Sequence, residues 1–189
     1  MKIGFFGGAF NPPTYAHLNI AKEAIAKMKL DQVFFVPIGN TYKKEGLIDE
    51  KNRYEMLKIL CKENFKLKVS DIELNKNKEM NVEQAFEMIS KEFKKENCEL
   101  FFIIGADNLK KILKFEKLKS TDYNYIIVNR NNIKIEENFK NFHVINIEEN
   151  FKDISSTKVR NLIKANKMEQ LNKYIPQDII EYINKNSCY

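Results

Sequence analysis

The 189-residue sequence has no tryptophan, only two histidines and only three cysteines. Cys61, Cys98 and Cys188 lack the spacing of a zinc site or a disulfide framework, which favours a reducing compartment and predicts a cytoplasmic protein. His17 and His143 alone cannot build a multi-histidine metal site. We therefore expect no metal bound by side chains, which still allows a magnesium ion carried by phosphates.

Long hydrophobic runs are also missing. Runs such as LFFIIGA, from Leu100, are too short to cross a bilayer, and no charged and apolar leader with a cleavage site precedes the first strand. We therefore expect neither a membrane partner nor a secretory signal. Hydrophobic residues still make up 43% of the chain, which predicts a globular protein, and the length suits a single domain over residues 1–189.

The formal net charge of +6 is not concentrated in one segment. The lysines are spread along the chain and interleaved with glutamate and asparagine, and no basic stripe with interleaved aromatics is visible. Such lysines are typical of solvated helix faces, so we expect no nucleic-acid partner.

Apolar runs of strand length alternate with segments of helical periodicity. Strands are expected near Lys2, Gln32, Phe65, Leu100, Tyr123 and Asn141. Helices are expected at about 18–28, 50–62, 81–95 and 109–113, and after Ile147 at SSTKVRNLIKA, at about 168–174 and after Pro176. Continuous apolar strands separated by helices indicate a parallel sheet covered on both faces. The sequence therefore predicts an α/β fold, a Rossmann-like doubly wound, mostly parallel sheet with a helical carboxy-terminal segment.

The common glycine-rich nucleotide motifs are absent, since neither G-x-G-x-x-G nor a P-loop occurs. In a doubly wound sheet the carboxyl end of the first strand is nevertheless the usual phosphate site, and here it carries Gly7 and Gly8 before a helix. His17 falls in the first or second turn of that helix. The residues alone leave two roles open for it, a phosphate ligand or a partly buried histidine bonded to a loop carbonyl.

A second segment, ISSTKVR at residues 154–160, opens a helix near the end of the chain. A serine cap, free N–H groups in the first turn and an arginine one turn later are suited to binding a triphosphate. The same pattern also describes an ordinary capped helix with a surface arginine, so the segment alone does not decide between the two.

Together, GGAFNPPTYAH (residues 7–17) and ISSTKVR resemble the motifs of the nicotinamide or nicotinate mononucleotide adenylyltransferases, within the nucleotidyltransferase superfamily. PIGNTYKKEGLI, IIGAD and IIVNR follow in the expected order, so the resemblance spans nearly the whole chain. It implies transfer of the adenylyl group of ATP to a pyridine mononucleotide, giving NAD or deamido-NAD and pyrophosphate, with Mg²⁺ carried by the ATP phosphates. It leaves a homo-oligomer open.

Two alternatives to this function stay open. One is a sister enzyme of the superfamily, a phosphopantetheine adenylyltransferase or a cytidylyltransferase. The other is a non-catalytic nucleotide-binding regulator on the same fold.

The resemblance also implies roles for individual residues. His17 and Arg160 would be catalytic. The expected ATP-binding residues are Gly7, Gly8, Ala9, Phe10, His17, Gly105, Asp107, Arg130, Ser155, Ser156, Thr157 and Arg160. The expected mononucleotide-binding residues are Asn11, Lys43, Lys44 and Phe115. Asp107 could instead cap a helix, and the two lysines could belong to a solvated loop.

The chain departs from the family pattern at several positions. Thr14 stands where most bacterial members carry a histidine, and Ala16 replaces the usual glycine. The stretch 42–48 looks more like the eukaryotic branch, which accepts both the amide and the acid mononucleotide, so the resemblance does not imply a preference for the acid. Without tryptophan, Phe115 is expected to provide a smaller stacking platform for the pyridine ring.

Overall fold

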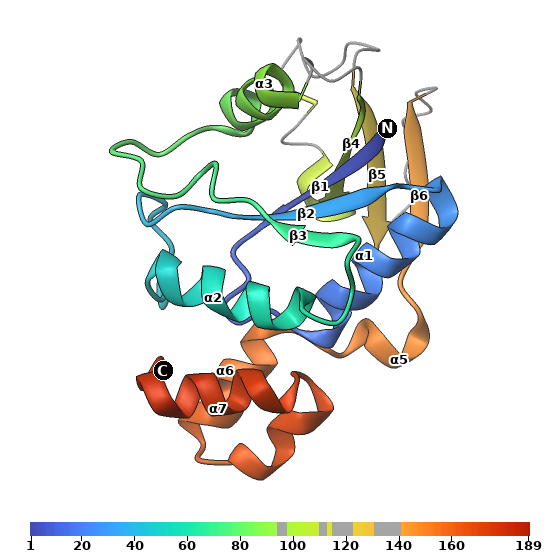
Figure 1. Ribbon diagram of the computed structural model, residues 1–189. Coiled ribbons are helices and arrows are strands. Elements are labelled where there is room, and N and C mark those ends of the chain that lie inside the picture. The colour runs from blue at the N-terminus through green and yellow to red at the C-terminus, as the bar shows by residue number, and fades with distance from the viewer. Residues whose placement is uncertain (94–97, 110–112, 115–122, 131–140) are drawn as a thin grey trace.

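A computed structural model of the chain describes residues 1–93, 98–109, 113–114, 123–130 and 141–189. These residues contain a six-stranded, all-parallel sheet in the order β3-β2-β1-β4-β5-β6 (Figure 1). The strands are β1 Lys2–Gly8, β2 Gln32–Pro37, β3 Leu67–Val69, β4 Glu99–Gly105, β5 Asn124–Asn129 and β6 Phe142–Asn146. The predicted Rossmann-like α/β fold is therefore confirmed.

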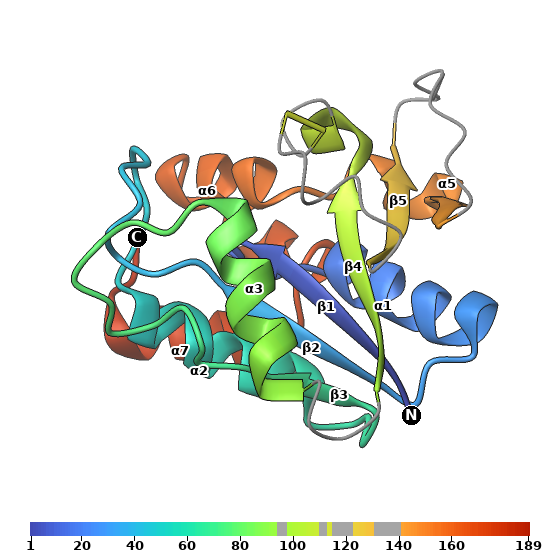
Figure 2. The same cartoon turned by 90° about the horizontal axis from the view of Figure 1, so that it is seen from above.

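The sheet is buried on both faces because helices cover both of them, as the view from above shows (Figure 2). Neighbouring residues of β1 point to opposite faces, and Phe6 joins the cluster formed by α1 (Tyr15–Met28) and α2 (Glu50–Cys61). Phe5 instead packs with α3 (Val82–Phe93) on the other face. Burial on both faces explains why the strands are continuous apolar runs rather than alternating ones.

The carboxy-terminal segment is helical, as expected from the sequence. It contains α5 (Glu149–Lys152), α6 (Ser156–Lys164), the 3-10 helix η4 (Met168–Lys173) and α7 (Gln177–Asn186). Side chains of α6 and α7 join the hydrophobic cluster of α1 and α2, so this segment packs on the same side as those helices (Figure 1). The short α5 was not predicted as a separate helix.

Two of the predicted helices extend into residues that the structure does not describe. The helix expected near 109–113 falls largely outside the described residues, which show a 3-10 helix, η2, just before it at Ala106–Asn108. The expected end of the third helix at Lys95 also lies outside them.

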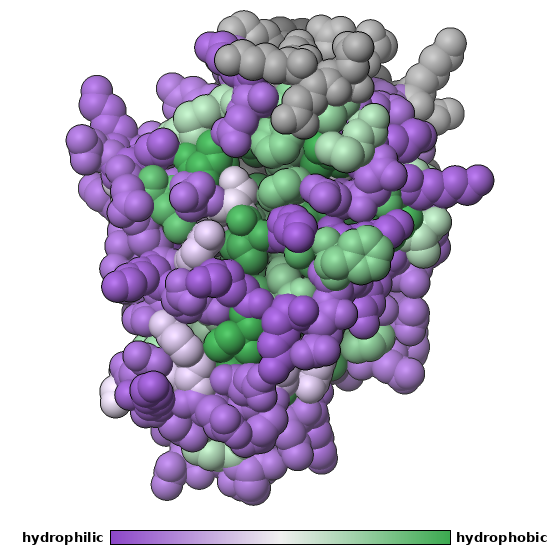
Figure 3. Space-filling view, in the orientation of Figure 1, coloured by the Kyte–Doolittle hydropathy of each residue, from purple (hydrophilic) through white to green (hydrophobic). Residues whose placement is uncertain are grey.

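The surface seen in Figure 3 is mainly hydrophilic, with hydrophobic side chains in separate patches. None of the described helices combines the length and apolar character needed to span a bilayer.

The sheet has its switch point at β1. From this strand the chain runs outward through β2 and β3 on one side, and later through β4, β5 and β6 on the other. A crevice is expected at the carboxyl ends of β1 and β4, because the connections leave these two strands in opposite directions. Gly8 and Gly105 stand at those two ends.

Candidate active site

Two cavities meet at the switch point. Their volumes are about 520 Å³ and 530 Å³, and we call them the cationic cavity and the apolar cavity after the side chains that line them. Their shared wall consists of Gly7, Gly8, Gly105 and Asn108. Two ligands, one in each cavity, would therefore approach one another across the ends of β1 and β4.

The cationic cavity brings together the two motifs recognised in the sequence, which are about 140 residues apart along the chain. The predicted site residues that line it are Gly7, Gly8, Ala9, Phe10, Asn11, His17, Lys44, Gly105, Asp107, Arg130, Ser155, Ser156, Thr157 and Arg160. Three cations and a single carboxylate among these residues make the cavity suitable for a polyanion.

Two of the predicted site residues are not among them. Lys43 lies on an exposed loop and lines neither cavity. Phe115 lies outside the described residues, so its stacking role stays a prediction.

His17 is the third residue of α1, and its ring is oriented by the residue that precedes the helix. The backbone N–H of Thr14 donates to Nδ1 of His17 at 3.0 Å, and the Thr14 hydroxyl lies 2.8 Å from the same nitrogen. Because a backbone N–H can only donate, Nδ1 acts as an acceptor and the ring proton of the neutral imidazole is on Nε2. His17 is thus oriented as a hydrogen-bond donor in the wall of the cationic cavity.

The surroundings of His17 keep its ring neutral. The ring packs edge-on against Phe10, with 5.1 Å between ring centroids, and lies 6.1 Å from the ring of Phe6. Burial, together with the charge of Arg130, lowers the pKa of His17 from 6.5 to about 3. The imidazole can therefore donate a hydrogen bond at neutral pH without carrying a charge.

The start of α6 is hydrogen-bonded directly to the loop that follows β1. The Ser156 hydroxyl donates to the carbonyl of Pro12 at 2.7 Å, and Nη1 of Arg160 donates to the carbonyl of Asn11 at 2.8 Å. Ser155 caps the helix by accepting from the N–H of Lys158 at 3.2 Å. These contacts fix the helix amino end against the glycine loop, so that Ser155, Ser156 and Thr157 line the cationic cavity.

Asp107 and Arg130 line the same cavity at the carboxyl ends of β4 and β5. A β-carbon at Gly105 would stand 2.3 Å from Oδ1 of Asp107, so the position of this carboxylate requires glycine at 105. Burial lowers the pKa of Arg130, and the charge of Asp107 opposes that shift. The two side chains thus form a charged pair of opposite sign at the ends of β4 and β5.

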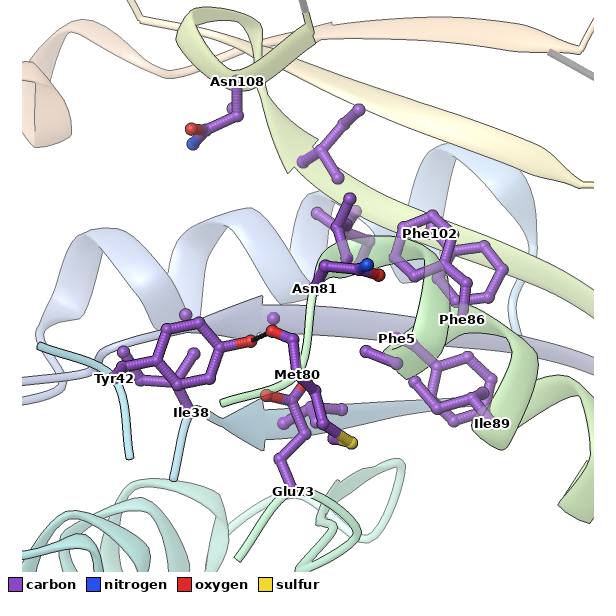
Figure 4. Close-up of a pocket in the computed structure, with 18 of the residues that line it drawn as sticks. Phe5, Ile38, Tyr42, Glu73, Met80, Asn81, Phe86, Ile89, Phe102 and Asn108 are labelled. Atoms are coloured by element: carbon purple, nitrogen blue, oxygen red, sulfur yellow. Dashed lines mark hydrogen bonds between the residues drawn. The ribbon is translucent and has the colours of Figure 1, made fainter. Parts of the chain in front are cut away.

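The apolar cavity lies between the sheet and α3 (Figure 4). Phe5, Phe86, Ile89 and Phe102 line one end of it, and Tyr42, Glu73 and Met80 line the other (Figure 4). The hydroxyl of Tyr42 donates to the carbonyl of Met80 and so connects the loop after β2 with the segment before α3. This combination of a flat apolar wall and a polar end suits an aromatic ring with a polar substituent.

Glu73 is a buried carboxylate in this cavity. Its side chain is 7% exposed, and within the described part of the chain its Oε2 has no hydrogen-bond partner. Burial raises the pKa of Glu73 from 4.5 to about 7, against a smaller opposite effect of the Tyr42 hydroxyl. The carboxyl therefore titrates near neutral pH.

We expect Glu73→Gln to change the pH dependence of stability. Between pH 4.5 and 7 the folded chain holds the Glu73 proton more tightly than the unfolded chain does, because the folded-state pKa is raised. The wild type therefore loses unfolding free energy as pH rises through this window, by up to about 1.4 kcal/mol per pH unit, and the variant escapes that loss. Denaturant unfolding without ligands at several pH values measures the difference. Glu79→Gln, at an exposed position of the same cavity, serves as control and should follow the wild-type profile.

Sequence reasoning missed three residues that organise the site, namely Arg53, Glu73 and Tyr189. Arg53 is fully buried and donates to loop carbonyls beside both cavities. The hydroxyl of Tyr189 donates to Asn11 at 2.9 Å. Arg53 and Tyr189 act through contacts that join distant segments, and Glu73 acts through its burial, none of which periodicity or local motifs can reveal.

The residues that the structure describes contain no group of three or more His, Cys, Asp or Glu side chains suited to binding a metal ion.

Comparison with known proteins places the chain among nucleotidyltransferases. The family model described as Cytidylyltransferase-like matches residues 5–162. A probable nicotinate-nucleotide adenylyltransferase of Clostridium acetobutylicum is 32% identical over 100% of this chain and 98% of its own length. A probable nicotinate-nucleotide adenylyltransferase of Clostridium botulinum is 36% identical with the same coverage of both chains.

Among solved structures, the nicotinic acid mononucleotide adenylyltransferase of Plasmodium falciparum complexed with NaAD has the same fold. The TM-score is 0.79, the match covers 98% of this chain and 96% of that one, and 23% of the sequence is identical. The same protein complexed with APC matches with the same values.

Proposed function

Because the chain belongs to the nicotinate-nucleotide adenylyltransferases of the cytidylyltransferase-like family, we propose that it transfers the adenylyl group of ATP to the phosphate of a pyridine mononucleotide. The products are pyrophosphate and either deamido-NAD or NAD. The observation that supports this reaction best is the pair of cavities with a shared glycine wall. ATP fits the cationic cavity, and the pyridine ring fits the apolar cavity.

The reaction requires alignment rather than a covalent intermediate with the protein. An oxygen of the mononucleotide phosphate attacks the α-phosphorus of ATP, and the bond from that phosphorus to the oxygen bridging to the β-phosphorus breaks. Gly7 and Gly8 lie in the wall where the two substrates meet, and a β-carbon at Gly7 would contact nothing within 4 Å. Positioning of this kind supplies on the order of 7 to 11 kcal/mol of barrier reduction.

The lining residues of the cationic cavity supply donors and positive charge. His17 donates from Nε2 to the α/β-phosphate region, and the first-turn N–H groups of α6 together with Arg160 hold the β- and γ-phosphates. Asp107 binds the ATP ribose and Arg130 lies at the adenosine end. Magnesium, held by the ATP phosphates, would neutralise charge on the departing pyrophosphate.

Incubation with ATP, magnesium and each mononucleotide in turn tests the proposal. We expect pyrophosphate and the matching dinucleotide with nicotinate mononucleotide, nicotinamide mononucleotide or both. Phosphopantetheine with ATP, and CTP with a sugar-alcohol phosphate, test the sister reactions. No product with either pyridine substrate would refute the proposal, and ATP binding without turnover would indicate a non-catalytic regulator.

The chemistry of the cysteines supports a cytoplasmic location as part of this proposal. Cys61, Cys98 and Cys188 are all free thiols. A reducing compartment keeps such thiols unpaired, which favours the cytoplasm.

We expect Arg160→Ala to impair the use of ATP. The variant loses a guanidinium that can donate two hydrogen bonds to one phosphate in the cationic cavity. It also loses the hydrogen bond to the carbonyl of Asn11. Loss of one charge-assisted contact should raise KM for ATP by about tenfold or more. Steady-state kinetics with varied ATP measure the effect. Lys158→Ala on the exposed side of the same helix should leave KM for ATP close to the wild-type value, and an equal rise in both variants would argue against the assignment.

A further inference from the structure

Tyr189 reaches the loop after β1 from the far end of the described chain. The backbone of Ser187 is in the left-handed region, with φ of 47°, and the N–H of Cys188 donates to the carbonyl of Ile183 at 3.2 Å. This turn at the end of α7 directs the next residues back toward the site. The Tyr189 hydroxyl then donates to Oδ1 of Asn11 at 2.9 Å.

The side chain of Asn11 is held between three partners and is only 3% exposed. Its Nδ2 donates to the carbonyl of Gly46 at 2.7 Å, and its Oδ1 accepts from the N–H of Ile48 at 3.4 Å as well as from Tyr189. All three partners agree with one orientation of the amide. The bond from Ile48 is long, so the Tyr189 hydroxyl is the stronger of the two donors that fix Oδ1.

Gly46 and Ile48 belong to the loop that carries Lys44. Lys44 is exposed and lines the cationic cavity, so the amide of Asn11 connects the glycine loop to the loop that brings this cation to the site. Gly46 has a φ of 66° and lies in a turn, outside any helix or strand, so no regular backbone hydrogen bonding fixes this part of the loop.

We propose that Tyr189 is a positioning residue for the transfer reaction, acting through Asn11 to hold the loop of Lys44 at the substrate phosphates. The inference rests on the proposed function. Tyr189 itself lines neither cavity. Its hydroxyl fixes the Asn11 amide, the amide fixes the backbone at 46 and 48, and that backbone determines where the Lys44 ammonium can reach.

Tyr189→Phe removes the hydroxyl and keeps the ring that packs against the hydrophobic cluster. We expect kcat/KM to fall about tenfold, the equivalent of one buried hydrogen bond, because Oδ1 of Asn11 then keeps only the long bond from the N–H of Ile48. The wild type is assayed first. An inactive wild type would refute the proposed function, whereas an active wild type with an equally active Tyr189→Phe variant would refute only the role of Tyr189.

Tyr182→Phe is the matched control, because the Tyr182 hydroxyl donates to Oδ1 of Asn52 at 3.0 Å and neither residue lines the cationic or the apolar cavity. Both variants lose one hydrogen bond from a tyrosine to an asparagine; Tyr182 lies in α7, and Tyr189 lies three residues beyond the end of that helix. We expect similar thermal stability in the two variants and reduced kcat/KM in Tyr189→Phe alone. Equal kinetic losses would overturn the proposal, since they would indicate a general loss of stability.

A double-mutant cycle with Lys44→Ala tests the route of the effect. If the Tyr189 hydroxyl acts by positioning Lys44, removing it from a chain that already lacks the Lys44 ammonium should change kcat/KM less than twofold. A full tenfold loss in that background would overturn the proposal, because the two residues would then act independently.

Discussion

Replacing His17 with alanine is expected to reduce turnover about a hundredfold or more, by analogy with the loss of one preorganised oxyanion donor. The structure gives this expectation its physical basis. Thr14 holds Nδ1 as an acceptor, so the donor at Nε2 is already oriented before substrate binds. Steady-state measurement of kcat with saturating ATP and mononucleotide checks the result.

Two comparisons separate a donor role for His17 from a packing role. His143→Ala removes the other histidine, which stands on β6 outside both cavities, and should leave kcat within about twofold of wild type. Because the pKa of His17 is lowered to about 3, the pH profile of kcat should also show no titration of His17 between pH 5 and 8. Turnover that survived the His17→Ala substitution would show that the ring serves packing against Phe10.

The fold was predictable because its signals are local. Strands buried on both faces need continuous apolar runs, and such runs marked β1, β2, β4 and β5 at nearly their observed positions. The 3-10 helix η2 was not predicted, because three residues are too few to show helical periodicity in the sequence. The short α5 escaped prediction for the same reason.

The site residues that belong to a sequence motif were predictable, and those that depend on a tertiary contact were not. His17 and Arg160 belong to recognisable segments, and the doubly wound topology explains why these segments meet. Glu73 and Tyr189 sit in segments with no motif of their own. Their roles depend on a buried carboxyl in one case and a hydrogen bond across 178 positions in the other.

A signal for Arg53, one of the three residues that sequence reasoning missed, was nevertheless present in the composition. The chain has 32 basic residues, but only three of them are arginines, Arg53, Arg130 and Arg160. Arg130 and Arg160 line the cationic cavity, and Arg53 contacts the loops around it. Arginine offers a planar set of five donors that lysine cannot replace, so scarce arginines in a lysine-rich chain indicate positions with several acceptors.

Replacing Arg53 with methionine is expected to lower the free energy of unfolding by about 3 kcal/mol or more, because three buried carbonyls lose their donor at about 1 to 3 kcal/mol each. The side chain of Arg53 is 0% exposed and donates to the carbonyls of Ala9 at 3.0 Å, Ile38 at 2.6 Å and Ile48 at 2.9 Å. Methionine fills similar space but leaves all three carbonyls without their donor. Denaturant unfolding of the variant and the wild type measures the loss.

The same substitution should affect both substrates, because Arg53 joins loops on both sides of the shared wall. Ala9 lines the cationic cavity and Ile38 lines the apolar one, so KM for ATP and KM for the mononucleotide should rise together. Lys51→Met, an exposed position on the same helix, should change unfolding by no more than about 0.5 kcal/mol and leave both KM values unchanged. Arg53→Lys should fall between the two, because a single ammonium cannot reach three carbonyls that surround a planar guanidinium. If KM rose for one substrate alone, Arg53 would position the loop of only one cavity. The two cavities would then not depend on the same side chain for their geometry.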